Sequence, residues 1–395
     1  MTIARLRSPA LAAGVTLLVS ASMLSAQTTV TIPPIDFSGV IYSSFQYRVD
    51  QRAKNFNQFN IDRAYLTFRM PAGDRASIRI TTDVFQQTST PQDAYYAGWA
   101  IRLKYAYMQY NYINGKTPSD VTAAFRMGSL HTVIIDHEEQ FWPRWISQTD
   151  VERAGLMASA DVGVATQITL PNKFGEIYVP VTNGPGYASR ELDRFKDPQA
   201  RITITPLAGS GKGLFSTWAI SPWVYKGEVA SQFVNSPAPG PTSNGPIGMG
   251  LDRNRWGVFT GIRDPRLTIA GAYTSFKGQS QTGLNTPASQ AVTVDSSGHI
   301  LSGFIVTKPL ALFDTGFTRL NLVARYDRVT TNTNYNPEAQ YHVFIGGIFC
   351  DLSRRVAMSV DYQEQLSDNY PVVNGATITP TQPLRQWFVH MVANF

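Results

Sequence analysis

The chain of 395 residues is 43% hydrophobic but only 16% charged, whereas roughly a quarter of the residues of a soluble domain are charged. Its net charge of +6 is spread along the chain without a charge block, linker or low-complexity tract, so we expect one domain and no nucleic-acid partner. Phe and Tyr, at 21 and 18 residues, favour strands, and this composition indicates an all-β fold.

The first 26 residues predict export. Arg5 and Arg7 precede an apolar run from Ala10 to Leu24, which closes on "SMLSAQ". This order is typical of a secretory signal peptide, so we expect cleavage near Ala26 and a single mature domain over 27–395. A retained membrane anchor is the alternative, but the run is shorter than the ~20 apolar residues that a spanning helix needs. No cysteine follows the run, which argues against a lipoprotein.

Apolar side chains then recur at every second position in segment after segment. In "RAYLTFRM", Leu66 and Phe68 lie opposite Tyr65 and Thr67, and no segment of similar length keeps a helical period. A period of two indicates a strand with one apolar face. The expected strands span 35–49, 57–70, 75–86, 99–112, 120–130, 153–170, 174–182, 197–206, 213–227, 252–262, 265–277, 298–308, 317–330, 340–350, 354–366 and 384–395.

Short turns and long connections alternate between these strands. Pro, Gly, Asp and Asn favour turn dihedrals, and tight turns are expected at 71–74, 171–173, 263–265 and 351–354. Long polar connections are expected at 131–152, 228–251, 278–297 and 367–381. Outer-membrane barrels have short periplasmic turns and long outer loops, so an even number of about 16 strands predicts a transmembrane antiparallel β-barrel. A soluble secreted β-sandwich is the alternative, but it has no need of this alternation.

The last strand ends on a large apolar side chain. Trp387, Met391 and Phe395 share one face of "RQWFVHMVANF". In a closed barrel this strand pairs with the first, and an outward Phe395 lies in the aromatic girdle at the membrane rim. An alternating strand that ends in Phe resembles the signal that the barrel insertion machinery reads. Trp387 and Phe395 are therefore the predicted insertion signal, and that machinery is a predicted partner.

The faces opposite the apolar ones carry more basic than acidic side chains. Rings of Arg or Lys line anion pores, and the Arg fork binds oxyanions at two points. In the alternative, these cations only pair with acids such as Asp83 and Asp327 and keep a wet interior folded. The predicted pore-lining, anion-attracting residues are Arg48, Arg63, Arg69, Arg79, Arg102, Lys104, Arg126, Arg201, Arg253, Arg255, Arg325 and Arg355.

The third outer loop, 131–152, contains the densest set of chemical groups, in "HTVIIDHEEQFWPRW". Its His-Glu-Glu lacks the H-E-x-x-H spacing of a helical metal site, so we expect neither a metal nor a cofactor. Trp142 and Trp145 are expected to anchor the loop to the barrel wall, with its glutamates facing Arg144. The predicted constriction residues are Asp136, His137, Glu138, Glu139 and Arg144.

The sequence matches none of the enzyme motifs that we considered. "LAGSGKG" lacks the first glycine of a phosphate loop, and Gly213 stands where Ser or Thr must bind magnesium, so we interpret it as a turn. There is no G-x-S-x-G, and only 5 His are present. A barrel enzyme with a Ser, a His and an acid at its rim is one alternative. A substrate-specific channel is another, because the tyrosines of "YYAGWAIRLKYAYMQYNY" could stack on sugar rings. The lone Cys350 is expected to be structural.

Several segments resemble the phosphate-selective porin O/P family. They are "NIDRAYLTFRMPAGDRASIRITTDV", "RMGSLHTVIIDHEEQFWPRWISQTDVERAGLMASADVGV", "VTNGPGYASRELDRFKDPQARITITPL" and the last strand. The resemblance covers most of the mature chain. It implies a homotrimeric barrel of the same strand number, a third loop folded into the pore and an anion path lined by Arg and Lys. Phosphate-selective members are expected to use lysines at the constriction, and 131–152 contains none, so general porin behaviour is favoured.

These patterns predict a porin of the bacterial outer membrane and no enzymatic activity. The channel is expected to be water-filled, and small solutes diffuse through it passively, anions such as phosphate among them. Fixed cations in a narrow pore raise the local anion concentration without holding any one ion for long. Outer-membrane lipid, lipopolysaccharide, small anionic solutes and two further copies of the chain are the expected partners.

Overall fold

The computed structural model describes residues 34–51, 53–86, 98–191, 193–209, 213–230, 250–282, 292–312, 318–334, 340–368 and 383–395. The predicted signal peptide, and most of the connections expected at 228–251 and 367–381, lie outside these residues. Among the described residues, no helix combines the length and the apolar character that crossing a bilayer requires.

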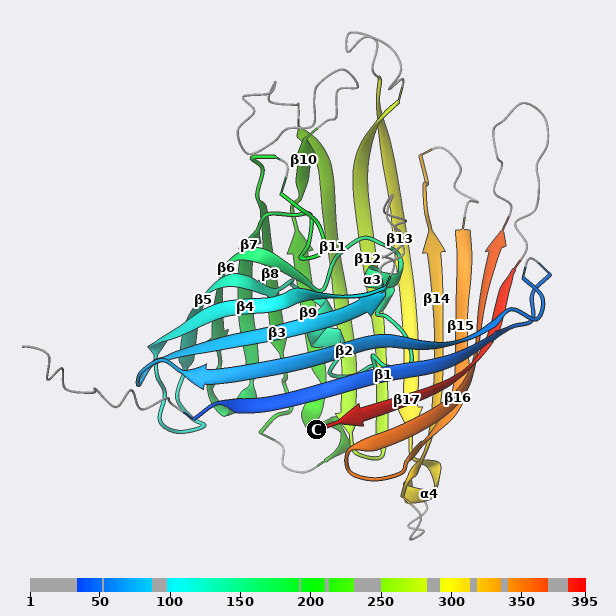
Figure 1. Cartoon of the computed structure of the whole chain (residues 1–395). Helices are drawn as coiled ribbons and strands as arrows, with labels where there is room; N and C mark the ends of the chain where they lie inside the picture. Colours follow the sequence, from blue (N-terminus) through cyan, green and yellow to red (C-terminus); the bar gives the residue numbers. More distant parts are fainter. Residues whose placement is uncertain are drawn as a thin grey trace, which may run out of the picture. The chain divides into compact units, whose positions relative to one another are not determined.

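The described strands form one antiparallel sheet that closes on itself (Figure 1). Each strand pairs with its neighbour in sequence, β9 pairs with β11, and β17 pairs with β1. Of the seventeen strands, the short β10 (Glu228–Ala230) only lengthens the pairing edge of β11, which leaves sixteen around the barrel. Their bounds are β1 (Asp36–Arg48), β2 (Asn57–Pro71), β3 (Ala76–Gln86), β4 (Trp99–Ile113), β5 (Thr122–His131), β6 (Ala160–Thr169), β7 (Gly175–Thr182), β8 (Asp197–Ile204), β9 (Ala219–Tyr225), β11 (Gly250–Asp264), β12 (Leu267–Thr282), β13 (Val292–Thr307), β14 (Leu320–Thr330), β15 (Gln340–Asp351), β16 (Val356–Asp368) and β17 (Leu384–Asn394).

Every expected strand is confirmed, and the boundaries of four are corrected. The strand expected at 153–170 begins only at Ala160, because the residues before it form α3 (Asp150–Arg153) and an irregular segment. The strand expected at 213–227 begins at Ala219, because a 3-10 helix, η3 (Leu214–Thr217), occupies its start. The hairpin of β12 and β13 is longer than expected, so part of the connection predicted at 278–297 is strand. The remaining short helices are α2 (Ile135–Glu138), η2 (Pro171–Lys173) and α4 (Pro309–Leu312).

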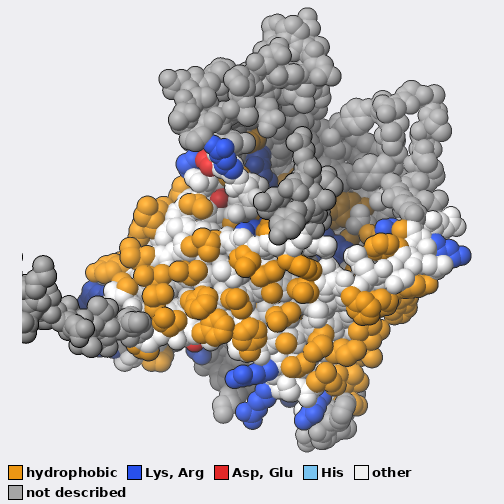
Figure 2. Space-filling view, viewed as in Figure 1, with side chains coloured by type: hydrophobic (Ala, Val, Ile, Leu, Met, Phe, Trp, Pro, Cys, Tyr) orange, Lys and Arg blue, Asp and Glu red, His pale blue; other side chains and the backbone are white. Residues whose placement is uncertain are grey.

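The outside of the barrel is apolar. Large hydrophobic side chains at the outward positions are well exposed, such as Ile101 at 71% and Met127 at 60%. Figure 2 shows hydrophobic side chains covering the side of the barrel, with Lys and Arg gathered towards its ends. A soluble protein would not expose an apolar surface of this extent, whereas a transmembrane barrel needs one where its wall faces lipid.

The seam between β1 and β17 explains the aromatic end of the chain. Gly39 and Phe395 exchange two backbone hydrogen bonds, of 2.9 and 3.0 Å. The Phe395 ring lies over Gly39, where an added Cβ would come within 2.3 Å of a ring carbon, and its centroid is 5.9 Å from that of Phe37. The last side chain is therefore packed against the first strand on the outer surface. Its role in insertion stays a prediction, as does that of Trp387, which is 48% exposed.

Candidate functional site

The chain between β5 and β6 folds across the inside of the barrel, and we call residues 132–159 the inner segment. Its apolar side chains are almost fully buried, and they include Val133, Ile134, Ile135, Trp142, Ile146 and Val151. They pack against inward side chains of the opposite wall, namely Phe259, Phe304, Val323, Val343 and Ile345. The Trp142 ring lies 5.1 Å from that of Phe304, and the Trp145 ring lies 5.5 Å from that of Phe349. Both tryptophans thus contact the wall as expected, and the segment is longer than the predicted 131–152.

Polar side chains of the wall bind the backbone of the inner segment. Arg263 donates to the carbonyl of Gln140 at 2.9 Å, and Gln363 donates to that of Ile146 at 3.2 Å. The Arg201 guanidinium donates to the carbonyl of Val133. The carbonyls of Val133 and Ile146 are buried, where the lack of a partner would be costly, so these contacts stabilise the segment in its place.

Four acidic side chains of the inner segment fall into two pairs. Arg144 binds Glu139 at 2.8 Å and Glu152 at 2.9 Å, which agrees with the expected facing of Arg144 by a glutamate. Glu138 instead turns away and lies buried beside Asp150. Burial and the Asp150 carboxyl raise the pKa of Glu138 well above its usual value.

The wall formed by β2 to β5 is both basic and aromatic. The pairing of β3 with β4 shifts between Thr81 and Thr82, and Lys104 is the extra residue of this bulge. Beyond the bulge Tyr105 and Tyr107 point inward, and only 4% and 8% of their surfaces are exposed. Sequence reasoning placed these tyrosines in the lumen only under the alternative of a sugar channel, and they are not among the predicted pore-lining residues. The signal that could have found them is the apolar phase of β4, which changes from Ile101 and Leu103 to Ala106 and Met108.

Three cations of this wall have no carboxylate partner among the described residues. Arg79 donates to the Nε2 atom of His131 at 3.2 Å and lies over the Tyr105 ring at 4.4 Å. Arg126 donates to Gln109 at 2.8 Å and lies over the Tyr107 ring at 5.4 Å. Lys104 donates to the Tyr65 hydroxyl at 3.3 Å. Their charges are therefore not balanced by a direct ion pair.

Most of the other predicted pore residues are ion-paired. The pairs are Arg48 with Asp50, Arg63 and Arg102 with Asp83, Arg69 with Asp36, Arg201 with Glu176, and Arg325 with Asp327. Two assignments are corrected. The Arg325 side chain has no exposed surface, because the inner segment covers it. Arg355 lies exposed in the turn after β15, because β16 begins only at Val356. Arg253 and Arg255 remain on the inward face of β11 with no paired carboxylate among the described residues.

The histidines of this region were also considered as parts of a catalytic or metal site, and their contacts are structural. His137 Nε2 lies 2.9 Å from the Ser221 hydroxyl, but this serine is fully buried and no described carboxylate pairs with the imidazole. The pair holds the inner segment on β9. His131 lies 3.2 Å from Asp136. Within the described ranges, no three His, Cys, Asp or Glu side chains come together as metal ligands.

Comparison with known proteins identifies the fold. No family model matches the sequence, and a search of curated proteins finds no relative. Among solved structures, OmpT of Vibrio cholerae in its trimer form has a TM-score of 0.55 at 10% identity, covering 92% of this chain and 100% of that one. The outer membrane channel DcaP of Acinetobacter baumannii gives 0.56 at 12% identity, over 91% and 97%. OmpF of Salmonella typhi, solved in complex with daunomycin, gives 0.58 at 10% identity, over 92% and 98%. The chain therefore has the closed antiparallel barrel fold of bacterial outer-membrane porins.

Proposed function

We propose that this chain forms a water-filled channel in the bacterial outer membrane, through which small solutes diffuse passively and anions pass preferentially. The closed barrel and its apolar exterior support the membrane location. Charged and tyrosine side chains on the inner face, together with a segment folded across the interior, support a narrowed polar pore. An enzyme is not supported, because the buried Ser221 and His137 are the wall contact of the inner segment.

One observation carries the anion preference. Arg79, Lys104 and Arg126 gather on β3, β4 and β5 without a direct carboxylate partner among the described residues. A narrow pore between low-dielectric walls focuses the field of such charges and raises the local concentration of anions. The paired arginines contribute less to this field, since carboxylates offset most of their charge, although Arg63 and Arg102 share the single carboxylate of Asp83. The inner segment contains no lysine, so we propose a general preference for small anions rather than selectivity for phosphate.

A second candidate, a channel that slides sugars over aromatic rings, draws on the inward tyrosines. Tyr65, Tyr105 and Tyr107 do form an aromatic surface on the inner wall. However, Arg79 and Arg126 lie over two of these rings, and all three rings are buried. A sugar needs an open ring face on which to stack, so this arrangement supports the anion channel better.

Assembly and targeting belong to the same proposal. OmpT of Vibrio cholerae has been solved in a trimer form, and we propose a homotrimer for this chain as well. The outward Trp387 and Phe395 suit the aromatic girdle and the insertion signal. Lipid and lipopolysaccharide would then contact the apolar outer face.

The test is the reversal potential of the purified protein in a planar bilayer across a KCl gradient. An anion-selective potential is expected. A cation-selective potential would overturn the assignment of the pore-lining cations. If the purified, folded barrel gives no conductance, the channel itself is refuted.

A further inference from the structure

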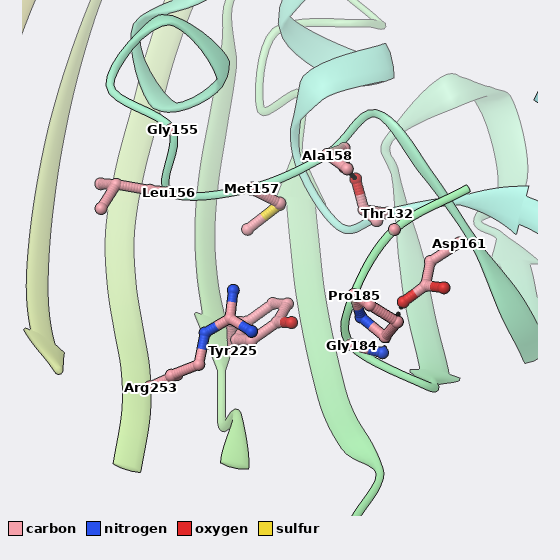
Figure 3. Close-up of a pocket in the computed structure, with 11 residues that line it drawn as sticks. Thr132, Gly155, Leu156, Met157, Ala158, Asp161, Gly184, Pro185, Tyr225 and Arg253 are labelled. Atoms are coloured by element: carbon pink, nitrogen blue, oxygen red, sulfur yellow. Dashed lines mark hydrogen bonds between the residues drawn. The ribbon is translucent and has the colours of Figure 1, made fainter. Parts of the chain in front are cut away.

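A cavity of about 220 Å³ lies beside the inner segment, against the inward faces of β9 and β11 (Figure 3). Its lining residues are Thr132, Gly155, Leu156, Met157, Ala158, Asp161, Gly184, Pro185, Gly186, Tyr225 and Arg253. Pockets for drug-sized ligands measure roughly 300–1,000 Å³, so this cavity suits a smaller solute. The pore-lining cations of β3 to β5 take no part in it.

Arg253 supplies the free charge of the cavity. In Figure 3 its guanidinium projects towards Met157 beside the Tyr225 ring. This guanidinium forms no hydrogen bond or ion pair with another described residue, whereas the backbone N–H of Arg253 donates to the Gly227 carbonyl at 2.8 Å. Arg255, on the same face of β11, lies over the Tyr225 ring at 4.6 Å, and its buried Nη1 atom has no hydrogen-bond partner in this part of the chain. The Asp197 carboxylate acts on both guanidinium groups, so together they leave a net positive charge on this wall.

The other polar side chains that line the cavity already have partners. Asp161 accepts hydrogen bonds from the backbone of Val162 at 2.7 Å and of Gly184 at 2.6 Å. Thr132 donates to the carbonyl of Ala158 at 2.6 Å, and the Tyr225 hydroxyl donates to Asp197. Arg253 is therefore the group available to a solute, and a carboxylate matches its planar fork.

The rest of the lining favours a solute whose uncharged part is compact and apolar. Leu156, Met157 and Pro185 are apolar, and the Tyr225 ring adds an aromatic face. The lining is tightly packed at one side of the cavity, because a Cβ added to Gly186 would lie 2.5 Å from the Cβ of Ala158. The Asp161 carboxylate also disfavours a second negative charge on the solute.

We propose that this cavity binds a small organic monocarboxylate, with its carboxylate on Arg253 and its compact apolar body against Tyr225 and Met157. The proposal rests on the function of the chain as an anion-preferring channel, and it names one solute class that such a channel would carry. Inorganic phosphate fits less well, because it lacks an apolar body and exists partly as a dianion at neutral pH.

Benzoate tests the proposal, with benzamide as its uncharged isostere and inorganic phosphate as the competing anion. Binding to the folded protein in detergent is measured by equilibrium dialysis, and current through single channels is recorded with each probe. The variants are Arg253→Gln and, as the control for loss of one positive charge, Arg266→Gln in the exposed turn between β11 and β12. Heat-modifiable electrophoretic mobility checks that each variant is folded.

We expect benzoate to bind and to reduce the current, and benzamide to do neither. Arg253→Gln should weaken benzoate binding at least about tenfold, because a charge-assisted contact is lost, while Arg266→Gln binds as the parent does. Equal binding of phosphate and benzoate would overturn the organic class, and unchanged binding by Arg253→Gln would overturn the site. An anion-selective reversal potential without benzoate binding would refute this inference alone, whereas a cation-selective potential would refute the proposed function.

Discussion

Arg325 on β14 donates a hydrogen bond of 2.8 Å from its Nη1 atom to the carbonyl oxygen of Gln148, and so ties the inner segment to the opposite wall. The same guanidinium binds Asp327 at 2.8 Å and lies over the Trp142 ring at 5.0 Å. One guanidinium thus contacts a carbonyl, a carboxylate and an aromatic ring at the same time. A buried charge is stable only with such partners, so this contact should hold the inner segment in one position against the wall.

Arg325→Met should therefore destabilise the barrel. The variant leaves the Asp327 carboxylate buried and unpaired, and breaking a buried pair in this way costs about 3–5 kcal/mol. The measurement is urea unfolding in lipid vesicles, combined with single-channel recording, in which a released inner segment increases current noise. The double variant Arg325→Met/Asp327→Leu should recover much of the stability. A single variant as stable and as quiet as the parent would show that the contact does not hold the segment.

Neutralising Arg79 and Arg126 together should reduce the anion preference. Each is replaced by Gln, which keeps a polar side chain of similar size over the tyrosine ring. The reversal potential should move towards zero, because two of the three unbalanced charges of that wall are gone. Replacing Arg266 and Lys173, which lie in turns, by Gln removes the same charge and should leave the potential nearly unchanged. If both double variants shift the potential equally, the effect is due to net charge and not to the wall.

Stability should depend on pH through Glu138. Its pKa is raised in the folded protein, so the folded state holds a proton that the unfolded state loses above pH 4.5 or so. Stability therefore falls as the pH rises from that point towards the raised value. Glu138→Gln should remove this dependence, so its unfolding midpoint gains on that of the parent as the pH rises above the ordinary pKa of a glutamate. Asp36→Asn, at an exposed carboxyl, is the control for the loss of one acidic group, and the gain of Glu138→Gln should exceed any change that it shows. A parallel pH dependence of Glu138→Gln and the parent would contradict the buried proton.

Gly39→Ala should act through Phe395. The added methyl group occupies the place of the ring and displaces it, because the two would lie within 2.3 Å. We expect the folded fraction after assembly into lipid to fall, as it should for Phe395→Ala. The combined variant should be no worse than Phe395→Ala alone, because both changes remove one contact. Gly271→Ala on β12, where the nearest atom is at 3.5 Å, is the matched control. Additive losses in the combined variant would count against the contact.

Much of the barrel was predictable because its wall separates lipid from a polar interior at every second residue. That is why the sequence of β2, with Leu66 and Phe68 outward, could be placed correctly. β15 resisted the same reasoning, since Val343 and Ile345 point inward although they are apolar. The cause is the inner segment, which covers them. An apolar side chain on both faces of a strand is the sign that something packs inside.

The charges of the interior were less predictable than the strands. Alternation places Arg79 and Arg102 on the inward face. It does not show that Asp83 forms an ion pair with Arg102 while Arg79 has no carboxylate partner. That difference depends on the register of neighbouring strands and on the bulge at Lys104. The cavity at Arg253 was beyond prediction for the same reason, because several segments distant in sequence build it.

The contact between Arg325 and Gln148 joins residues 177 positions apart in the chain. The inner segment follows β5, yet most of the apolar wall on which it rests belongs to β11 and later strands, besides its contacts with β8 and β9. The surface on which the inner segment packs is therefore incomplete until the second half of the protein has joined the sheet. Contacts between residues so distant in sequence form late. We expect the nascent barrel to pass through a stage with a wide, unobstructed bore, and the passage to narrow only as the last act of folding.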